Sequence, residues 1–141
     1  MPALDTNVLV RFLVGDDARQ SALARSLIER CMDRAECLFV PLTVTLEIEW
    51  VLRARYGFAR DAIRATLVRL LETKELEFQD EASIERALYF HRSTNADFAE
   101  CLHLGSAITH KQIPFLTFDQ SAARLEGAEL LAAGYSTKSS A

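Results

Sequence analysis

The sequence has few of the residues that cross-link, bend or anchor a chain. Its 141 residues include three cysteines, three prolines and five glycines. The cysteines, Cys31, Cys37 and Cys101, form no CxxC pair, which argues against a disulfide framework and favours reduced, buried thiols in the cytoplasm. No apolar run approaches the roughly 20 residues that span a bilayer. The first residues show no basic segment followed by an apolar one, so we expect neither a membrane association nor a signal peptide.

Several catalytic signatures are also missing. The chain contains no GxSxG, P-loop, GxGxxG or HExxH motif. Its formal net charge of −4 argues against nonspecific nucleic-acid binding, although an enzyme whose acids are neutralised by a metal is not excluded. Half of the residues are hydrophobic and 26% are charged, as in a compact globular protein. We expect one domain over residues 1–135 and a flexible C-terminal tail over 136–141.

Short apolar segments alternate with helical patterns along the chain. The patterns predict strands at 2–5, 38–41, 76–78, 115–118 and 128–131. They predict helices at 6–14, 44–56, 60–72, 80–91 and 97–111, and one that Asp16 or Asp17 caps and that runs to Arg34. This alternation is typical of a parallel sheet with helices on both faces. Helix exceeds strand, so we expect a three-layer α/β/α fold with a small, mostly parallel sheet.

Two acids follow apolar strands directly. Asp5 ends the first strand and Asp119 ends the strand at 115–118, and each precedes a helix. Ligands of open α/β sheets bind beyond the carboxyl ends of the strands, which makes both acids candidates for one site. Taken singly, each acid is also a normal helix N-cap.

A third acid, Glu47, falls within the predicted helix at 44–56. At about 100° per residue it shares an apolar face with Val44, Trp50, Val51 and Ala54, whereas Glu49 faces away towards Arg53. We therefore expect Glu47 to point inward and Trp50 to lie in the core. A buried carboxylate needs a partner or a cation.

Asp97 and Glu100 form a further pair at the start of the helix at 97–111. Capping explains an Asp at this position, but it does not require a second carboxylate one turn later. Carboxylates that meet at one site repel each other by about 4 kcal/mol per pair at an effective dielectric of 20. Such a cluster needs raised pKa values or a bound divalent cation, and oxygen ligands without His or Cys favour Mg²⁺ or Mn²⁺.

At these residues the chain resembles the PIN-domain family, and most closely its VapC-type toxins. The resemblance covers nearly the whole chain and rests on four segments in order: 4–9 (LDTNVL), 46–52 (LEIEWVL), 96–100 (ADFAE) and 116–119 (LTFD). Each segment alone is a weak signal, but the set at these separations is fairly specific.

The resemblance implies a PIN-like fold and a Mg²⁺- or Mn²⁺-dependent endoribonuclease that acts as the toxin of a toxin–antitoxin pair. By position, the acids that match the family's catalytic quartet are Asp5, Glu47, Asp97 and Asp119. The implied metal ligands are Asp5, Asp97, Glu100 and Asp119, although the family often has Asp where this chain has Glu100. Thr6, Asn7 and Thr117 would hydrogen-bond the acids or a phosphate oxygen. The metal would activate a water for in-line attack on the scissile phosphate, without a covalent enzyme intermediate.

The implied partners are an RNA substrate, an antitoxin with a segment that blocks the pocket, and a second copy of the chain in a homodimer. Two surface features bear on them. The apolar stripe of the helix at 60–72 serves either the core, which we favour, or dimerisation. Arginines around the two middle helices form either an RNA-binding rim or an ordinary solvated face; they are Arg53, Arg55, Arg60, Arg64 and Arg69.

Other classes of protein fit the residues less well. A phosphoacceptor domain normally has an acidic pair at the first strand and a Lys after a late strand, but here Asp5 stands alone and Asp119 follows Phe118. A haloacid-dehalogenase-type phosphatase would have a second Asp at Asn7. The remaining alternative is a non-catalytic binding or scaffold protein that keeps the fold, and metal-dependent cleavage would distinguish it from an enzyme.

Overall fold

The structure, a computed structural model, describes residues 1–137 as two compact units that divide after Glu81. Each unit is described by itself below. Most of the tail expected to be flexible, residues 138–141, lies outside the described residues. The single domain expected over residues 1–135 stays a prediction. None of the helices in the described part of the chain combines the length and the apolar character of a membrane-spanning helix.

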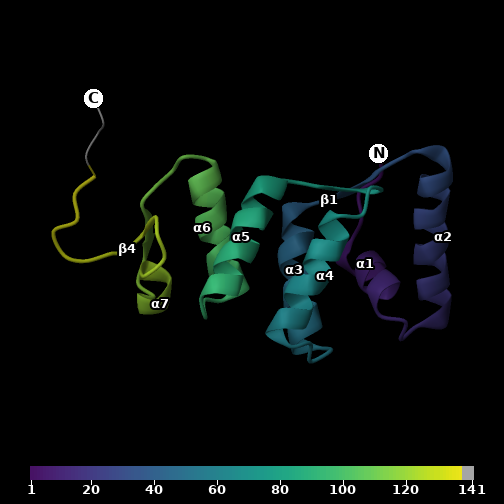
Figure 1. Cartoon of the computed structure of the whole chain (residues 1–141), viewed down its shortest axis with the longest axis horizontal. Coiled ribbons are helices and arrows are strands. Elements are labelled where there is room, and N and C mark those ends of the chain that lie inside the picture. Colours follow the sequence, from purple (N-terminus) through teal and green to yellow (C-terminus); the bar gives the residue numbers. More distant parts are fainter. Residues whose placement is uncertain (138–141) are drawn as a thin grey trace. The chain divides into compact units, whose positions relative to one another are not determined.

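The first unit contains four helices and two strands (Figure 1). They are α1 (Thr6–Leu13), α2 (Ala18–Arg34), β1 (Leu38–Val40), α3 (Leu42–Ala54), α4 (Arg60–Leu71) and β2 (Leu76–Phe78). β1 and β2 pair in parallel, with Leu38 opposite Leu76. The strand expected at 2–5 is reduced to a parallel bridge between Ala3 and Phe39, in which the Leu4 amide donates to the Phe39 carbonyl at 2.9 Å. Asp5 and α1 follow this bridge directly.

Local capping explains where α2 begins and ends. Asp17 caps α2 by accepting a hydrogen bond from the Gln20 amide at 2.9 Å, and Ala35 ends the helix in the left-handed conformation. The core is mainly aliphatic, with Phe78 from β2 also buried in it, and draws on every element of the unit. The predicted stripe of α4 belongs to it, because Ile63, Leu67 and Leu70 are almost fully buried.

The inward face of α3 differs from the sequence expectation. Its buried side chains centre on Ile48, which is fully buried, whereas Glu47 is exposed and Trp50 retains 48% of its exposure. Glu49, expected at the surface, is 5% exposed, and its carboxylate accepts a hydrogen bond from Arg53 at 2.8 Å. The predictions of an inward Glu47 and a core Trp50 are therefore wrong. Both residues lie beyond one edge of the aliphatic stripe, at about 100° per residue, and Glu49 lies on its other edge.

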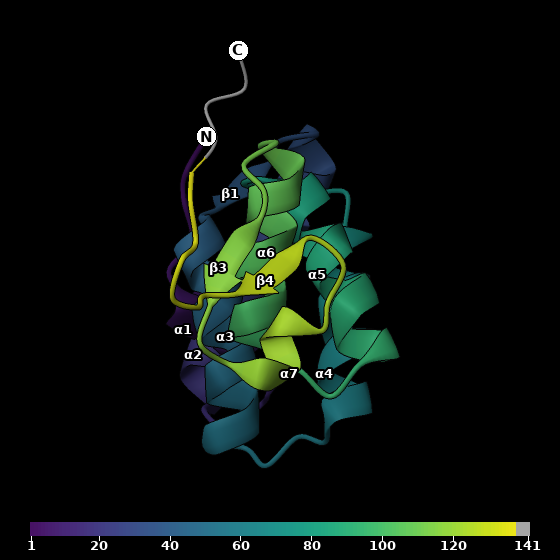
Figure 2. The ribbon, with the colours of Figure 1, turned by 90° about the vertical axis from the view of Figure 1, so that its left-hand side faces the viewer.

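The second unit contains three helices and two strands. They are α5 (Glu81–Ser93), which starts at the last residue of the first unit, α6 (Phe98–Thr109), β3 (Phe115–Thr117), α7 (Gln120–Ala123) and β4 (Ala128–Leu130). Figure 2 shows β3 and β4 side by side, and they pair in parallel with Phe115 opposite Ala128. α5 and α6 approach closely at Gly105, where a Cβ atom would lie 2.7 Å from the Ser83 carbonyl oxygen.

The two small sheets are parallel and helix dominates the chain, as the sequence predicts. The cysteines also behave largely as expected. All three are thiols outside any disulfide, Cys31 and Cys101 are buried, and Cys37 is partly exposed.

Candidate acidic site and the cleft between α1 and α2

Asp5 lies where the chain turns from the Ala3 bridge into α1. Its Oδ1 accepts a hydrogen bond from the Thr6 amide at 2.8 Å, so the capping interpretation of Asp5 is confirmed. The carboxylate is exposed, and the capping bond occupies one of its two oxygens. Thr6 is 2% exposed, and its hydroxyl oxygen has no hydrogen-bond partner among the described residues. This places an unpartnered hydroxyl directly beside the acid.

Asp119 occupies the corresponding position after β3. Its Oδ1 accepts a hydrogen bond from the Ala122 amide at 3.0 Å and caps the short helix α7. Thr117 holds the backbone of the acid, because its hydroxyl oxygen accepts from the Asp119 amide at 3.0 Å. Asp119 is therefore both an N-cap and an exposed carboxylate.

Asp97 behaves differently from the other two helix-start acids. It is the N-cap residue of α6 and has the extended backbone of a cap, but its exposed side chain makes no capping hydrogen bond. Glu100 follows one turn later, and its Oε2 atom is buried without a hydrogen-bond partner among the described residues. The Asp97 side chain is thus not explained by a capping hydrogen bond, and Glu100 Oε2 is buried without a partner among the described residues.

The segment before α6 is held by several contacts within its unit. The Thr94 hydroxyl donates to the Phe90 carbonyl at 2.6 Å and accepts from the Ala96 amide at 3.2 Å. His91 is 3% exposed and packs edge-on against Phe98, with 5.7 Å between the ring centroids. These contacts fix the start of the helix that carries Asp97 and Glu100.

The residues predicted for the site divide between the two units. The first unit holds Asp5, Thr6, Asn7 and Glu47, and the second holds Asp97, Glu100, Thr117 and Asp119. No group of three or more His, Cys, Asp or Glu side chains within residues 1–137 is arranged to hold a metal ion. That the four catalytic candidates act at one centre stays a prediction.

Sequence analysis missed a polar network in the first unit. The Tyr56 hydroxyl donates to Asp16 Oδ2 at 2.6 Å, and the Arg11 guanidinium donates to the Tyr56 oxygen at 3.1 Å and to Asp16 Oδ1 at 3.2 Å. The hydrogen bond from Tyr56, assisted by the charge of Arg11, lowers the pKa of Asp16. Donating that bond raises the pKa of Tyr56, and the bond to Tyr56 raises the pKa of Arg11. The network ties the end of α1 to the residues that follow α3.

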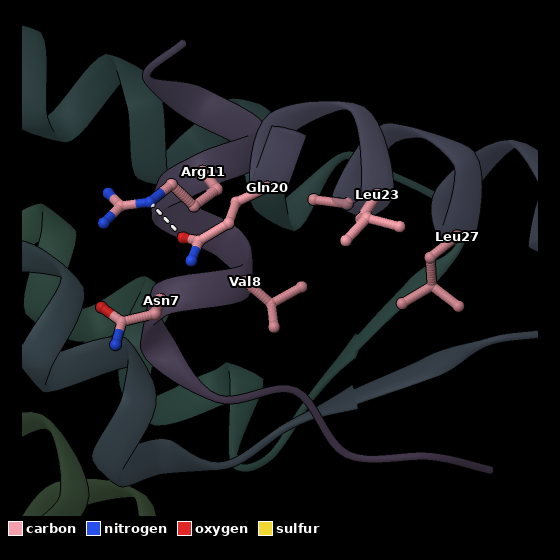
Figure 3. Close-up of a pocket in the computed structure, with 7 residues that line it drawn as sticks. Asn7, Val8, Arg11, Gln20, Leu23 and Leu27 are labelled. Atoms are coloured by element: carbon pink, nitrogen blue, oxygen red, sulfur yellow. Dashed lines mark hydrogen bonds between the residues drawn. The ribbon is translucent and has the colours of Figure 1, made fainter. Parts of the chain in front are cut away.

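A cleft of about 330 Å³ lies between α1 and α2, beside this network (Figure 3). Val8 from α1 and Leu23 and Leu27 from α2 give it an apolar lining. Arg11 Nε donates to Gln20 Oε1 at 2.7 Å, so this hydrogen bond joins the two helices at the polar part of the cleft. Asn7, two residues after Asp5, also lines it. The cleft thus combines an apolar surface with polar side chains from both helices.

Comparisons with known proteins identify the family. The sequence profile described as PIN domain matches residues 3–128. The chain belongs to the PIN domain family. This PIN domain is 26% identical over 102 residues to a VapC ribonuclease of Aquifex aeolicus (strain VF5), a match that covers 72% of this chain and 75% of that protein. It also aligns with a solved toxin–antitoxin complex from Klebsiella pneumoniae at 17% identity, over 91% of this chain and 95% of that one. The TM-score of that alignment is 0.34, which is too low to show that the two chains share a fold.

The helix-rich α/β class predicted from the sequence agrees with this family and with the small parallel sheets of the structure. The resemblance also implies a divalent cation, and the chemistry of the acids fits one. Every proposed ligand is a carboxylate oxygen, the type that Mg²⁺ and Mn²⁺ prefer. Within residues 1–137 the buried Oε2 of Glu100 has no hydrogen-bond partner, and burial of an unpaired carboxylate oxygen is costly unless a cation or donor compensates it.

Proposed function

We propose that this PIN domain is a metal-dependent endoribonuclease that hydrolyses RNA phosphodiester bonds and serves as the toxin of a toxin–antitoxin pair. Membership of the PIN family and the similarity to a protein named VapC ribonuclease support the activity. The start of α6 carries the argument from this chain's own residues. In the described part of the chain, the Asp97 side chain makes no capping hydrogen bond and Glu100 has a buried oxygen without a hydrogen-bond partner.

In this proposal Asp5 and Asp97 would hold Mg²⁺ or Mn²⁺, with Glu100 and Asp119 as further ligands. When bound, such a cation would supply an activated water and would compensate negative charge on the phosphate. The capping bonds of Asp5 and Asp119 hold each carboxylate in one orientation and leave the second oxygen of each available. Glu100 has a longer side chain than Asp and reaches the ion directly or through water.

Glu47 keeps its proposed role for a different reason from the one the helix pattern indicated. Because it is exposed, it is accessible to an RNA substrate and to the attacking water, which it orients. The polar side chains of Thr6, Asn7 and Thr117 complete the proposed site as donors to the acids or to a phosphate oxygen. Of these, Thr6 has the strongest structural support, because its buried hydroxyl has no hydrogen-bond partner among the described residues.

We assign the cleft between α1 and α2 to an antitoxin segment. Its lining is apolar at Leu23 and Leu27 and includes Asn7, so a segment bound there lies against α1, the helix that Asp5 caps. Leu23 is 60% exposed, which allows Leu23→Glu to be tested without loss of the core. This variant should lose inhibition by the antitoxin and keep its cleavage activity. A homodimer and a cytoplasmic location complete the proposal.

Cleavage of a mixed pool of tRNA, rRNA and mRNA with Mg²⁺, Mn²⁺ or EDTA tests the activity. Wild type should cleave only with metal, and Asp97→Asn should abolish cleavage without loss of thermal stability. Asp33→Asn is the matched control, because Asp33 is an exposed acid of α2 outside the proposed site. RNA binding without cleavage under every metal condition would instead support the non-catalytic scaffold.

A further inference from the structure

We propose that Trp50 and Arg55 form a subsite in which Trp50 stacks on an unpaired base of the RNA and Arg55 binds the neighbouring phosphate. The subsite rests on the proposed function, because it places the substrate next to Glu47. It also narrows the substrate class to single-stranded RNA or to loops, since bases within a duplex do not offer a free face for stacking.

The position of Trp50 is the first observation. It retains 48% of its exposure, although it lies on a helix whose neighbouring apolar side chains, such as Ile48 and Leu52, are fully buried. A single exposed apolar residue is common and by itself indicates nothing. Trp50, however, lies three residues after Glu47 on the exposed side of α3. That spacing separates their Cα atoms by about 4.5 Å along the helix axis and puts both side chains on neighbouring parts of the surface.

The position of Arg55 is the second observation. Its guanidinium carbon lies 5.9 Å from the centroid of the Trp50 ring, within the range of a cation–π contact. Within residues 1–137 the Arg55 side chain forms no ion pair or hydrogen bond, whereas Arg53 is paired with Glu49 and Arg64 with Asp61. Arg55 is thus a cation held beside an exposed aromatic ring, and no carboxylate among the described residues neutralises it.

Together these features match what single-stranded RNA requires of a protein surface. Aromatic rings stack on bases of any sequence, and an arginine beside the ring binds the backbone phosphate. A base stacked on Trp50 brings the adjoining phosphodiester close to Glu47. Of the two interpretations left open for the arginines, this assigns Arg55 to RNA and leaves Arg53 and Arg64 in local ion pairs.

Trp50 is the single tryptophan of the chain, so its fluorescence reports on the subsite directly. The probe is a short single-stranded RNA, titrated into wild type in EDTA and into Asp97→Asn with Mg²⁺. Binding should quench the fluorescence to saturation, and the same RNA annealed to its complement should not. With a labelled RNA, Trp50→Leu should bind at least about fivefold more weakly, the lower end of what one stacked base contributes. Trp50→Phe should retain most of the affinity.

Matched controls separate stacking from general effects. Tyr89→Leu removes an aromatic that is 67% exposed on α5 and should bind RNA as wild type does. Arg30→Gln, which removes an exposed arginine of α2, should weaken binding less than Arg55→Gln.

Each contrary outcome has its own meaning. Cleavage by wild type with no quenching, and unchanged RNA affinity in Trp50→Leu, would overturn the subsite and leave the ribonuclease intact. Quenching without cleavage under any metal condition would overturn the ribonuclease and keep an RNA-binding surface. Equal quenching by single strands and duplexes would overturn base stacking. Quenching that depends on protein concentration alone would assign the surface to a second copy of the chain.

Discussion

Gly105→Ala tests how closely α5 and α6 pack and whether that packing positions the acids. A Cβ atom at this position would lie 2.7 Å from the Ser83 carbonyl oxygen and 3.2 Å from the Ala87 amide nitrogen. Both are backbone atoms, so no side chain can rotate away. One helix must shift by about 0.7 Å for the oxygen contact to reach 3.4 Å, the near edge of ordinary packing.

Two opposing terms set the expected change in the free energy of unfolding. Overpacking of a tight contact costs about 1–3 kcal/mol. In the interior of a helix, replacing Gly by Ala returns about 1 kcal/mol of intrinsic helix preference. The net result should lie between no change and a loss of about 2 kcal/mol. Without the close contact, the variant would instead be more stable by about 1 kcal/mol.

Urea unfolding of Gly105→Ala measures this difference. Gly15→Ala is the control, because a Cβ atom there meets nothing within 4 Å, and it should cause no loss of stability. The shift should also move Asp97 and Glu100, which α6 carries, and misplacement of catalytic groups by an ångström can cost about 100-fold in rate. We therefore expect cleavage by Gly105→Ala to fall at least about tenfold. A more stable variant with full activity would refute the reasoning.

Three further predictions follow from single contacts. Glu100→Gln should weaken binding of Mg²⁺ in a calorimetric titration. Its melting temperature without metal should stay equal or rise, because the variant removes the charge of a partly buried carboxylate whose Oε2 has no hydrogen-bond partner among the described residues. A lower melting temperature would indicate a structural role. Tyr56→Phe should be less stable than wild type at neutral pH, because the hydrogen bond from Tyr56 lowers the pKa of Asp16 in the folded state. In urea unfolding, the difference in stability between the two proteins should shrink as the pH falls below 3.8, the ordinary pKa of Asp16, because the stabilisation is lost once Asp16 is protonated. A difference in stability that stays constant with pH would contradict this. Arg53→Ala should lower the free energy of unfolding by about 1–3 kcal/mol, because the buried Glu49 carboxylate loses its hydrogen bond from Arg53. Adding Glu49→Met should recover most of that loss. No recovery in the double variant would mean that Arg53 stabilises the fold mainly through other contacts.

Local signals in the sequence predicted most of the element boundaries. α2 begins after Asp17 and ends at Arg34, as its capping residue and periodicity indicate. Asp5 and Asp119 cap helices, which the sequence offered as the alternative interpretation of each. Such features depend on contacts between residues close in the chain, so the sequence carries them directly.

The errors fall where burial depends on distant elements. The sequence pattern of α3 placed Trp50 on the predicted buried face, because a large aromatic side chain is normally counted as part of a hydrophobic stripe. In the structure Trp50 is exposed. The packed face instead centres on Ile48, and Glu49 is buried with Arg53 beside it. The Asp16–Tyr56 hydrogen bond joins residues 40 positions apart, and a local sequence pattern does not predict such a contact.

The sequence singled out candidate acids, but it did not predict which of their side chains cap a helix. It treated Asp97 as the acid for which capping was an equally good explanation. In the structure Asp97 is the one whose side chain does not cap, whereas Asp5 and Asp119 do. Whether a side chain at a helix start turns back to its own backbone depends on rotamer and surroundings, which spacing does not reveal.

The capping bonds of Asp5 and Asp119 have a consequence for how this protein can change over evolutionary time. A descendant that lost cleavage would still need a residue at each position to start a helix, so Asp, Asn, Ser or Thr would persist there. Among the described residues, the Asp97 side chain makes no capping hydrogen bond and Glu100 Oε2 has no hydrogen-bond partner. In a lineage that kept only binding, those two positions would diverge first, and their residues would separate active from inactive copies.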